Sequence, residues 1–215
     1  MSDREIPGSV HDNETKNKIL DTATKLFALK GVGSVSMRDI AKVVGIKSSS
    51  IYHHYEGKDA LLDDILSRFE RGYRHYFDWL AEANSKADSV ETLMDNMFNK
   101  EFLKMLDPMG CLGMSLAIKE QHHNESARNC VFNLFLEHSV SRMQADFDRL
   151  IKKGIIPSSD TKTIATIFMF SVMVLNDVRL HEYTGVKPPI DCMEMYGGLK
   201  KTLLLLLATP PKEAP

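Results

Sequence analysis

Residues 36–55, with the sequence SMRDIAKVVGIKSSSIYHHY, constrain the fold of this 215-residue chain more than any other segment. Ser36 predicts the N-cap of a short helix that runs through Val43, since its hydroxyl can accept a hydrogen bond from a free backbone N–H. Gly45 predicts the end of that helix, because glycine adopts a positive φ without steric cost. A second short helix is expected over Ser48–Tyr55. This order of cap, helix, glycine turn and helix is typical of a helix-turn-helix.

The apolar residues of the segment predict which side is buried. Ile40 and Ala41 are expected to face the second helix, and Ile46 and Ile51 to fill the core. The side chains left facing outward are Lys47, Ser48, Ser49, Ser50, Tyr52, His53 and His54. Small serines allow a helix to lie deep in the major groove of DNA, where His53 and the serines would reach base edges. A hydroxyl both donates and accepts, so the serines predict no particular base.

Other residues of this region are suited to the phosphate backbone. Lys47, Tyr52 and Lys58 have the reach and the donors for phosphate oxygens. Ser36 and Arg38 stand at a helix N-terminus, where backbone N–H groups favour an anion. The complete set of predicted DNA-binding residues is Ser36, Arg38, Lys47, Ser48, Ser49, Ser50, Tyr52, His53, His54 and Lys58.

The charge distribution separates the two ends of the chain. Its net charge is −2 at pH 7, yet residues 13–60 carry eight Lys or Arg against five Asp or Glu, a net charge of +3, which leaves −5 for the remainder. Only the N-terminal part is therefore suited to a polyanion.

The stretch from Ile19 to Leu62 resembles the DNA-binding domain of TetR/AcrR family transcriptional regulators. The resemblance lies in a first helix, a short second helix, an Ala-x-x-x-Gly turn, a Tyr-x-x-aromatic recognition helix and a lysine that opens the next helix. Two positions depart from the family pattern: Ser49 stands where many relatives have Gly, and Tyr55 where Phe is more usual. The alternative is three amphipathic helices whose glycine and lysine are incidental.

The resemblance implies an all-α protein in which an N-terminal three-helix DNA-binding domain precedes a larger helical domain for ligand binding and dimerisation. It implies a homodimeric repressor that leaves a double-stranded DNA operator when a small, apolar molecule binds. Two other functions stay open: a constitutive DNA-binding protein without an effector, and a helical enzyme that begins with a helix-turn-helix. An enzyme is not expected, because the sequence has no Ser-nucleophile elbow, phosphate loop or His-Glu-x-x-His.

Three-and-four spacing of apolar residues predicts helices through the rest of the chain. The first contains Ile19, Ala23 and Phe27 and ends at Gly31. Later helices are expected over Lys58–Ala83, Val90–Met105, Cys111–Gln121, Glu125–Lys153, Thr161–Tyr183 and Asp191–Ala208, about nine in all. The predicted domains are a disordered N-terminus (1–12), the helix-turn-helix domain (13–60), the effector-binding and dimerisation domain (61–208) and a flexible tail (209–215).

The last two helices are expected to form the dimer. Apolar residues cover most of the circumference in Ile164–Val178 and Met193–Leu207, so each helix should be buried on two sides. A four-helix interface between two subunits satisfies this pattern, and an intramolecular core is the alternative. The predicted interface residues are Phe168, Val172, Leu175, Tyr196, Leu199, Leu203 and Leu206.

Methionines suggest an adaptable apolar pocket in the second domain. Ten of the twelve lie between Met94 and Met195, and methionine accommodates ligands of different shape, although ordinary core filling explains the cluster equally well. Gly110-Cys111-Leu112 is similar to the start of a helix in TetR regulatory domains. Asn176 would either orient a ligand or form an interhelical hydrogen bond. The predicted pocket residues are Phe69, Tyr73, Met105, Met109, Cys111, Met114, Ile118, Phe135 and Asn176.

No cofactor or metal is expected. The possible ligands Cys111, His122, His123, Cys130 and His138 lack the close spacing of a recognised metal site. Three cysteines without a signal peptide make a disulfide framework improbable and favour the cytoplasm. The longest apolar stretches are shorter than a bilayer-spanning helix requires, so no membrane association is expected.

Overall fold

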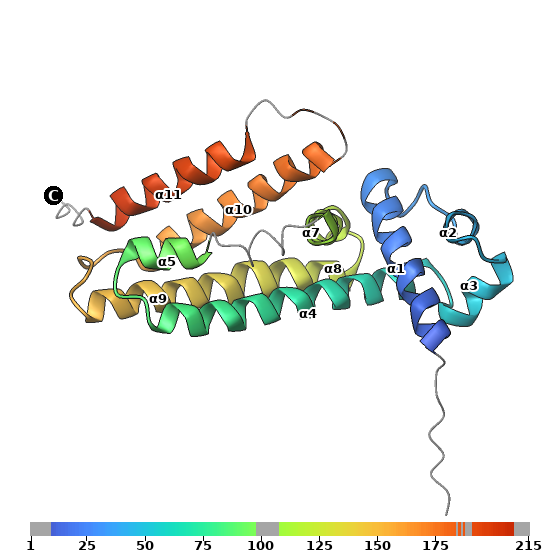
Figure 1. The fold of residues 1–215 in the computed structure, drawn as a ribbon, viewed down its shortest axis with the longest axis horizontal. Coiled ribbons are helices and arrows are strands. Elements are labelled where there is room, and N and C mark those ends of the chain that lie inside the picture. Colours follow the sequence, from blue (N-terminus) through green and yellow to red (C-terminus); the bar gives the residue numbers. More distant parts are fainter. Residues whose placement is uncertain (1–9, 98–107, 184, 186, 188–190, 209–215) are drawn as a thin grey trace, which may run out of the picture. The chain divides into compact units, whose positions relative to one another are not determined.

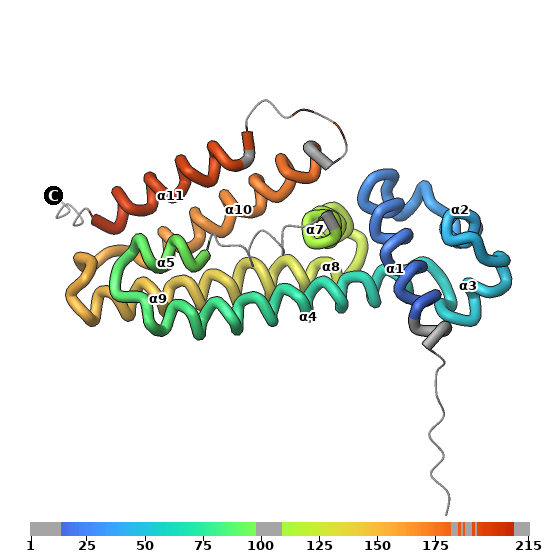
Figure 2. The backbone as a smooth tube through the Cα atoms, viewed as in Figure 1, coloured from blue at the N-terminus to red at the C-terminus, as the bar shows by residue number. Residues whose placement is uncertain are grey.

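The computed structural model describes residues 10–97, 108–183, 185, 187 and 191–208, and every regular element within them is a helix (Figures 1 and 2). The predicted all-α fold is confirmed. The chain divides into two compact units, Met1–Arg68 and Phe69–Pro215. The division falls inside a long helix, whereas the sequence predicted a domain boundary at residue 60.

Unit 1 contains α1 (Val10–Lys30), α2 (Met37–Val44), α3 (Ser48–His54) and the start of α4 (Lys58–Ser85). Helix α2 packs against both α1 and α3. Their apolar faces meet in a core where Ile19, Phe27, Ile40 and Ile51 are fully buried. The small Ala41 is also buried, which allows the close approach expected within a helix-turn-helix.

Two glycines end helices as predicted. Gly31 and Gly45 both have a φ of 82°, in the left-handed region that residues with a Cβ rarely adopt. The N–H groups of Gly45 and Ile46 both donate to the Ala41 carbonyl oxygen at 3.0 Å, so the end of α2 is capped by its own turn. Gly31 therefore sets the direction of the chain after α1, and Gly45 sets its direction between α2 and α3.

Tyr55 uses its hydroxyl to join three elements of unit 1. The side chain is buried, and its hydroxyl donates to Asp64 Oδ2 of α4 at 2.8 Å. Lys16 Nζ of α1 pairs with the same oxygen at 2.9 Å and lies 5.4 Å from the centre of the Tyr55 ring. Burial and the neighbouring carboxylate raise the pKa of Tyr55. This network gives a physical reason for tyrosine at a position where relatives usually carry phenylalanine.

Unit 2 begins with the rest of α4 and continues with α5 (Val90–Met97), α7 (Pro108–Glu120), α8 (Glu125–Asn129), the π-helix η1 (Cys130–Ser139), α9 (Val140–Lys152), α10 (Thr161–Tyr183) and α11 (Cys192–Ala208). Helices α8, η1 and α9 follow one another without a break and lie beside α4 (Figure 1). Helix α10 packs against α7, α9 and α11. The core of the unit therefore lies between the layer of α4 and α9 and the layer of α10 and α11.

The predicted helix over Glu125–Lys153 has the expected extent but not the expected geometry. Its middle is π-helical. The hydroxyl of Ser139 donates to the Leu134 carbonyl oxygen, five residues earlier, at 2.8 Å, and lies 3.3 Å from the Tyr73 hydroxyl. Apolar spacing does not separate a π-helix from an α-helix over ten residues, so the π-helix cannot be predicted from the pattern.

Two helix starts differ from the prediction. Helix α1 begins at Val10, so residues 10–12 belong to it and not to a disordered terminus; no proline or glycine interrupts them. Helix α7 begins at Pro108 and not at Cys111, because proline lacks only an N–H that the first helical turn leaves unpaired anyway. Residues 98–107, which include the predicted end of the Val90–Met105 helix, and the predicted tail 209–215 lie outside the described residues.

Helix α10 is long and apolar enough to cross a membrane. A window within Thr161–His181 has a mean hydropathy of 1.5, and 44% of that window is buried inside the protein. The expectation that no apolar stretch reaches the required length is therefore wrong. Core helices of globular proteins meet the same criterion, and Phe168, Val172 and Leu175 of α10 pack inside unit 2.

Candidate nucleic-acid interface

Helix α3 presents a continuous polar face to solvent. Ile51 is fully buried, whereas Tyr52 is 53% exposed. Lys47 at the N-cap and Ser48, Ser49 and His53 on the helix are exposed as well, and Ser50 and His54 are half-buried. Ser48, Ser49, Tyr52 and His53 are spaced by one and four residues and therefore share one side of the helix. The structure thus brings four of the predicted DNA-binding residues together on one side of α3, with Lys47 at its N-cap.

Ser36 has a structural role that the sequence only partly predicted. Its backbone N–H donates to Asp39 Oδ2 at 2.9 Å and its hydroxyl to the same oxygen at 2.6 Å, while the Asp39 N–H donates back to Ser36 Oγ at 3.2 Å. These hydrogen bonds form a capping box and hold the pKa of Asp39 below its ordinary value. The anion at the N-terminus of α2 is therefore the carboxylate of Asp39 itself, and the exposed Ser36 is already hydrogen-bonded to it.

Lys58 and Arg38 differ in their surroundings. Lys58 is half-buried, and its ammonium donates to the Val32 carbonyl oxygen in the loop after α1 at 2.8 Å. That bond uses one of three donors, so two remain for another acceptor. Arg38 is exposed on the first turn of α2. At the other end of α2, Val43 is 63% exposed beside the exposed Lys42, and neither residue is among the predicted DNA-binding residues.

Three of the predicted pocket residues of unit 2 pack against one another. Phe69, Tyr73 and Phe135 form an aromatic cluster with ring centroids 5.0–5.8 Å apart. A Cβ at Gly113 would lie 2.7 Å from the Phe69 ring, which shows how closely α7 approaches α4. Tyr73, Cys111, Met114, Phe135 and Asn176 are buried, Phe69, Met109 and Ile118 are half-buried, and Met105 lies outside the described residues.

Asn176 makes the interhelical hydrogen bond that was the alternative to ligand binding. Its Nδ2 donates to the Cys111 carbonyl oxygen of α7 at 3.3 Å. Its Oδ1 is buried and accepts no hydrogen bond from the residues that the structure describes. The Asn176 amide therefore joins α10 to α7 through its NH₂ group.

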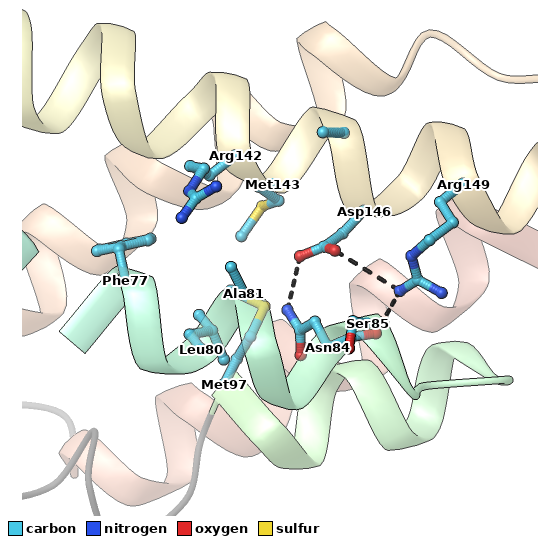
Figure 3. A pocket seen from close by; sticks show the side chains of 11 residues that line it. Phe77, Leu80, Ala81, Asn84, Ser85, Met97, Arg142, Met143, Asp146 and Arg149 are labelled. Atoms are coloured by element: carbon cyan, nitrogen blue, oxygen red, sulfur yellow. Dashed lines mark hydrogen bonds and ion pairs between the residues drawn. The ribbon is translucent and has the colours of Figure 1, made fainter. Parts of the chain in front are cut away.

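A cavity of about 260 Å³ lies elsewhere in unit 2, between α4, α5 and α9 (Figure 3). None of the predicted pocket residues lines it. Its lining comprises Phe77, Leu80, Ala81, Asn84, Ser85, Met97, Arg142, Met143, Ala145, Asp146 and Arg149. One feature of the sequence does indicate this cavity. Arg142, Asp146 and Arg149 are spaced by four and three residues and therefore place three charged side chains on one helix face.

The predicted dimer residues lie mostly in the core of a single chain. Phe168, Val172, Leu175, Tyr196 and Leu203 are at most 5% exposed and have almost no surface left for a second chain. Leu199 is half-buried, and Leu206 is 43% exposed. The sequence prediction took the inner face of α10 for the outer one. On the outer face, Ile167, Phe170 and Val174 are all more than half exposed.

No group of three His, Cys, Asp or Glu side chains within the described residues has the geometry to hold a metal ion. Cys111 and Cys130 are both buried as free thiols. Burial raises the pKa of Cys130 to about 12, so its thiol stays protonated at neutral pH.

Comparisons with known proteins identify the class to which this architecture belongs. Residues 19–65 match the model of the bacterial regulatory proteins of the tetR family. The biofilm operon icaADBC negative transcriptional regulator IcaR of Staphylococcus aureus (strain Newman) is 37% identical over 151 residues, which cover 63% of this chain and 77% of that relative. The chain therefore belongs to the TetR family. The matched family is one of bacterial regulatory proteins, and the curated relatives are named as transcriptional regulators, none as an enzyme.

Similarity to other relatives is concentrated in the N-terminal part. The transcriptional repressor KstR2 of Rhodococcus jostii (strain RHA1) is 43% identical over 54 residues, or 25% of this chain and 26% of KstR2. Several curated relatives are matched over less than half of their own length. Among solved structures, the SmeT–triclosan complex superposes with a TM-score of 0.66 at 18% identity, covering 94% of this chain and 99% of SmeT, which establishes a common fold.

Proposed function

We propose that this chain is a cytoplasmic, homodimeric repressor that binds a double-stranded DNA operator and releases it when a small molecule binds unit 2. The observation that carries the proposal is the exposed side of α3, where Ser48, Ser49, Tyr52 and His53 face solvent while Ile51 anchors the helix. Such a helix, placed after a glycine turn, fits the major groove. The net charge of +3 over residues 13–60 favours the polyanion.

The exposed faces of α10 and α11 support a dimer. Ile167, Phe170 and Val174 are spaced by three and four residues and form one apolar stripe on α10. Leu205 and Leu206 are exposed on α11, which packs beside α10. Large apolar side chains gathered on neighbouring helices mark an interaction surface, and a second copy of this chain is the occupant we propose. Two recognition helices about one DNA turn apart would then read two half-sites.

A small-molecule effector is the third part of the proposal. SmeT, which shares the fold, was solved with triclosan. In this chain the cavity between α4, α5 and α9 is a better candidate site than the tightly packed cluster around Phe69. A ligand there releases DNA only if it binds the DNA-free arrangement more tightly than the DNA-bound one.

The DNA-binding part is tested with three variants on α3 and its N-cap. Tyr52→Ala should weaken binding to every duplex alike, because a phosphate contact carries no sequence information. Lys47→Ala should do the same and lower the slope of log affinity against log salt by about one. His53→Ala should change the preference among base sequences. Lys86→Ala, which removes an exposed lysine from unit 2, is the control and should change neither affinity nor slope.

The result that would contradict these roles is wild-type affinity of the Tyr52 and Lys47 variants for both specific and random duplexes.

The dimer is tested by sedimentation velocity. Phe170→Glu should produce monomers and weaken operator binding, whereas Phe132→Glu, at a side chain of similar exposure on η1, should leave the dimer intact. A Phe170→Glu protein that stays dimeric would refute the proposed interface.

A further inference from the structure

The cavity between α4, α5 and α9 has an apolar half built from three helices. Phe77, Leu80 and Ala81 come from α4, Met97 from α5 and Met143 from α9 (Figure 3). Its volume of about 260 Å³ lies just below the range of roughly 300–1,000 Å³ for clefts that bind drug-sized ligands, so a smaller molecule fits it. The methionine side chains can adapt to an apolar chain of varying shape. This half of the cavity is suited to a short hydrocarbon.

The opposite half is a polar network whose members already satisfy one another. Asn84 Nδ2 donates to Asp146 Oδ2 at 2.6 Å, and Asn96 Nδ2 donates to Asn84 Oδ1 at 3.2 Å. Arg149 donates to the Ala87 carbonyl oxygen at 2.9 Å and to that of Asn84, which closes the C-terminal end of α4. Its guanidinium also lies 3.6 Å from Asp146 Oδ1. These bonds hold the wall of the cavity in place before any ligand arrives.

Within the described residues, Arg142 is the lining cation that forms no hydrogen bond to this network, although its charge acts on Asp146. Its guanidinium donates to Asp78 at 3.1 Å, but Asp78 is 70% exposed, and a surface pair of this kind is weak. The Arg142 Nε is buried and finds no hydrogen-bond acceptor in the part of the chain that the structure describes. A guanidinium carries five N–H donors in a fork that fits a carboxylate. Among the lining side chains, Arg142 and Arg149 also outnumber the single carboxylate of Asp146.

We propose that this cavity binds a small amphipathic carboxylate, whose hydrocarbon lies against Leu80, Met97 and Met143 and whose carboxylate is held by Arg142. The further step, that this ligand is the effector, rests on the proposed function. Arg142 determines the specificity for a carboxylate in this proposal. Substitution of Arg142 alone therefore tests the proposal. A neutral molecule of the same length gains the apolar contacts and loses the ionic hydrogen bonds.

The experiment is calorimetric titration of the full chain with octanoate, and with octan-1-ol as the neutral match. We expect one octanoate per chain and binding of octan-1-ol at least tenfold weaker, since a hydrogen bond to a charged group contributes about 1.5–3 kcal/mol, or more than tenfold. Arg142→Met should lower octanoate affinity by about tenfold or more and remove the preference over octan-1-ol. Arg142→Lys should retain part of it. Arg128→Met, at an exposed arginine on α8, should bind like the wild type.

Trp79, the single tryptophan, lies on α4 between Phe77 and Leu80, so its emission gives a second readout of binding. Octanoate that does not bind, or that binds Arg142→Met as tightly as the wild type, would overturn the site. The operator complex is then titrated separately. Octanoate that binds with the expected Arg142 dependence but leaves the DNA complex intact would overturn only its effector role. A chain that binds no DNA with or without octanoate would overturn the proposed function and leave the carboxylate site standing.

Discussion

Gly45→Ala isolates the backbone requirement of the helix-turn-helix. Gly45 has a φ of 82°, and a Cβ added there would meet no atom within 4 Å. The substitution therefore causes no clash, and its effect comes from the backbone conformation alone. A left-handed residue with a Cβ costs about 1–2 kcal/mol, of which the smaller entropy of the unfolded chain offsets about 0.4–1 kcal/mol. The expected net loss of stability in unit 1 is about 1 kcal/mol.

Hydrogen exchange measures this loss within unit 1. The Tyr55 N–H donates to the Ile51 carbonyl oxygen at 3.0 Å, at the end of α3 and ten residues from the substitution. A loss of about 1 kcal/mol should lower its protection about fivefold if exchange requires unfolding of the unit. Gly45→Asn should lower protection less than Gly45→Ala, because asparagine tolerates the left-handed region better.

Gly33→Ala is the matched control. Gly33 lies in the turn after α1, has no left-handed φ, and would also place its Cβ in open space. Protection of the Tyr55 amide should stay the same or rise, since alanine restricts the unfolded chain. Equal losses for Gly33→Ala and Gly45→Ala, or no loss for Gly45→Ala, would refute the argument that the turn depends on a left-handed residue.

Two further predictions concern buried polar groups. Tyr55→Phe removes the hydroxyl that donates to Asp64, so it should lower the free energy of unfolding, measured by chemical denaturation, by about 1–2 kcal/mol. Tyr52→Phe, at an exposed side chain, should not lower it. Equal effects of the two substitutions would argue against the buried network. Burial and the nearby Arg74 and Arg142 hold the pKa of His138 below its ordinary value of 6.5, so the folded chain resists a proton that the unfolded chain accepts. Stability should therefore fall as the pH drops through about 6.5, and His138→Gln should reduce this dependence while His122→Gln leaves it unchanged. A pH profile that His138→Gln does not alter would contradict the assignment.

Sequence reasoning succeeded where one residue determines a local structure. Ser36 caps α2, Gly45 ends it, and Ile51 anchors α3, each by a physical rule that needs no knowledge of the rest of the fold. The exposed face of α3 then follows from helical spacing. The roles of Ser36 and Lys58 were less predictable. In the folded chain their donors bind Asp39 and the Val32 carbonyl oxygen, and these acceptors compete with DNA phosphates.

Unit 2 was harder to predict because its buried faces and its cavity depend on how the helices pack against one another. Helix α10 is apolar around most of its circumference, so spacing alone could not decide whether Phe168 or Phe170 faces outward. The cavity depends on how α4, α5 and α9 pack, and spacing along one helix carries no information about that packing. The close approach of Gly113 to the Phe69 ring likewise depends on how α7 packs against α4. A charged stripe on α9 was the one sequence feature that marked the cavity, since long charged side chains on the inner face of a helix must find partners.

The measurement that tests the central claim most directly is fluorescence anisotropy of the purified chain with a duplex from its own upstream region and a scrambled duplex, each titrated with salt. The account predicts tight binding that prefers the upstream duplex and weakens steeply as salt rises, because phosphate contacts release counterions. It also predicts that Tyr52→Ala weakens binding to both duplexes. Salt-independent binding, or affinity for both duplexes that Tyr52→Ala leaves unchanged, would contradict the claim that the exposed face of α3 is the DNA-binding surface.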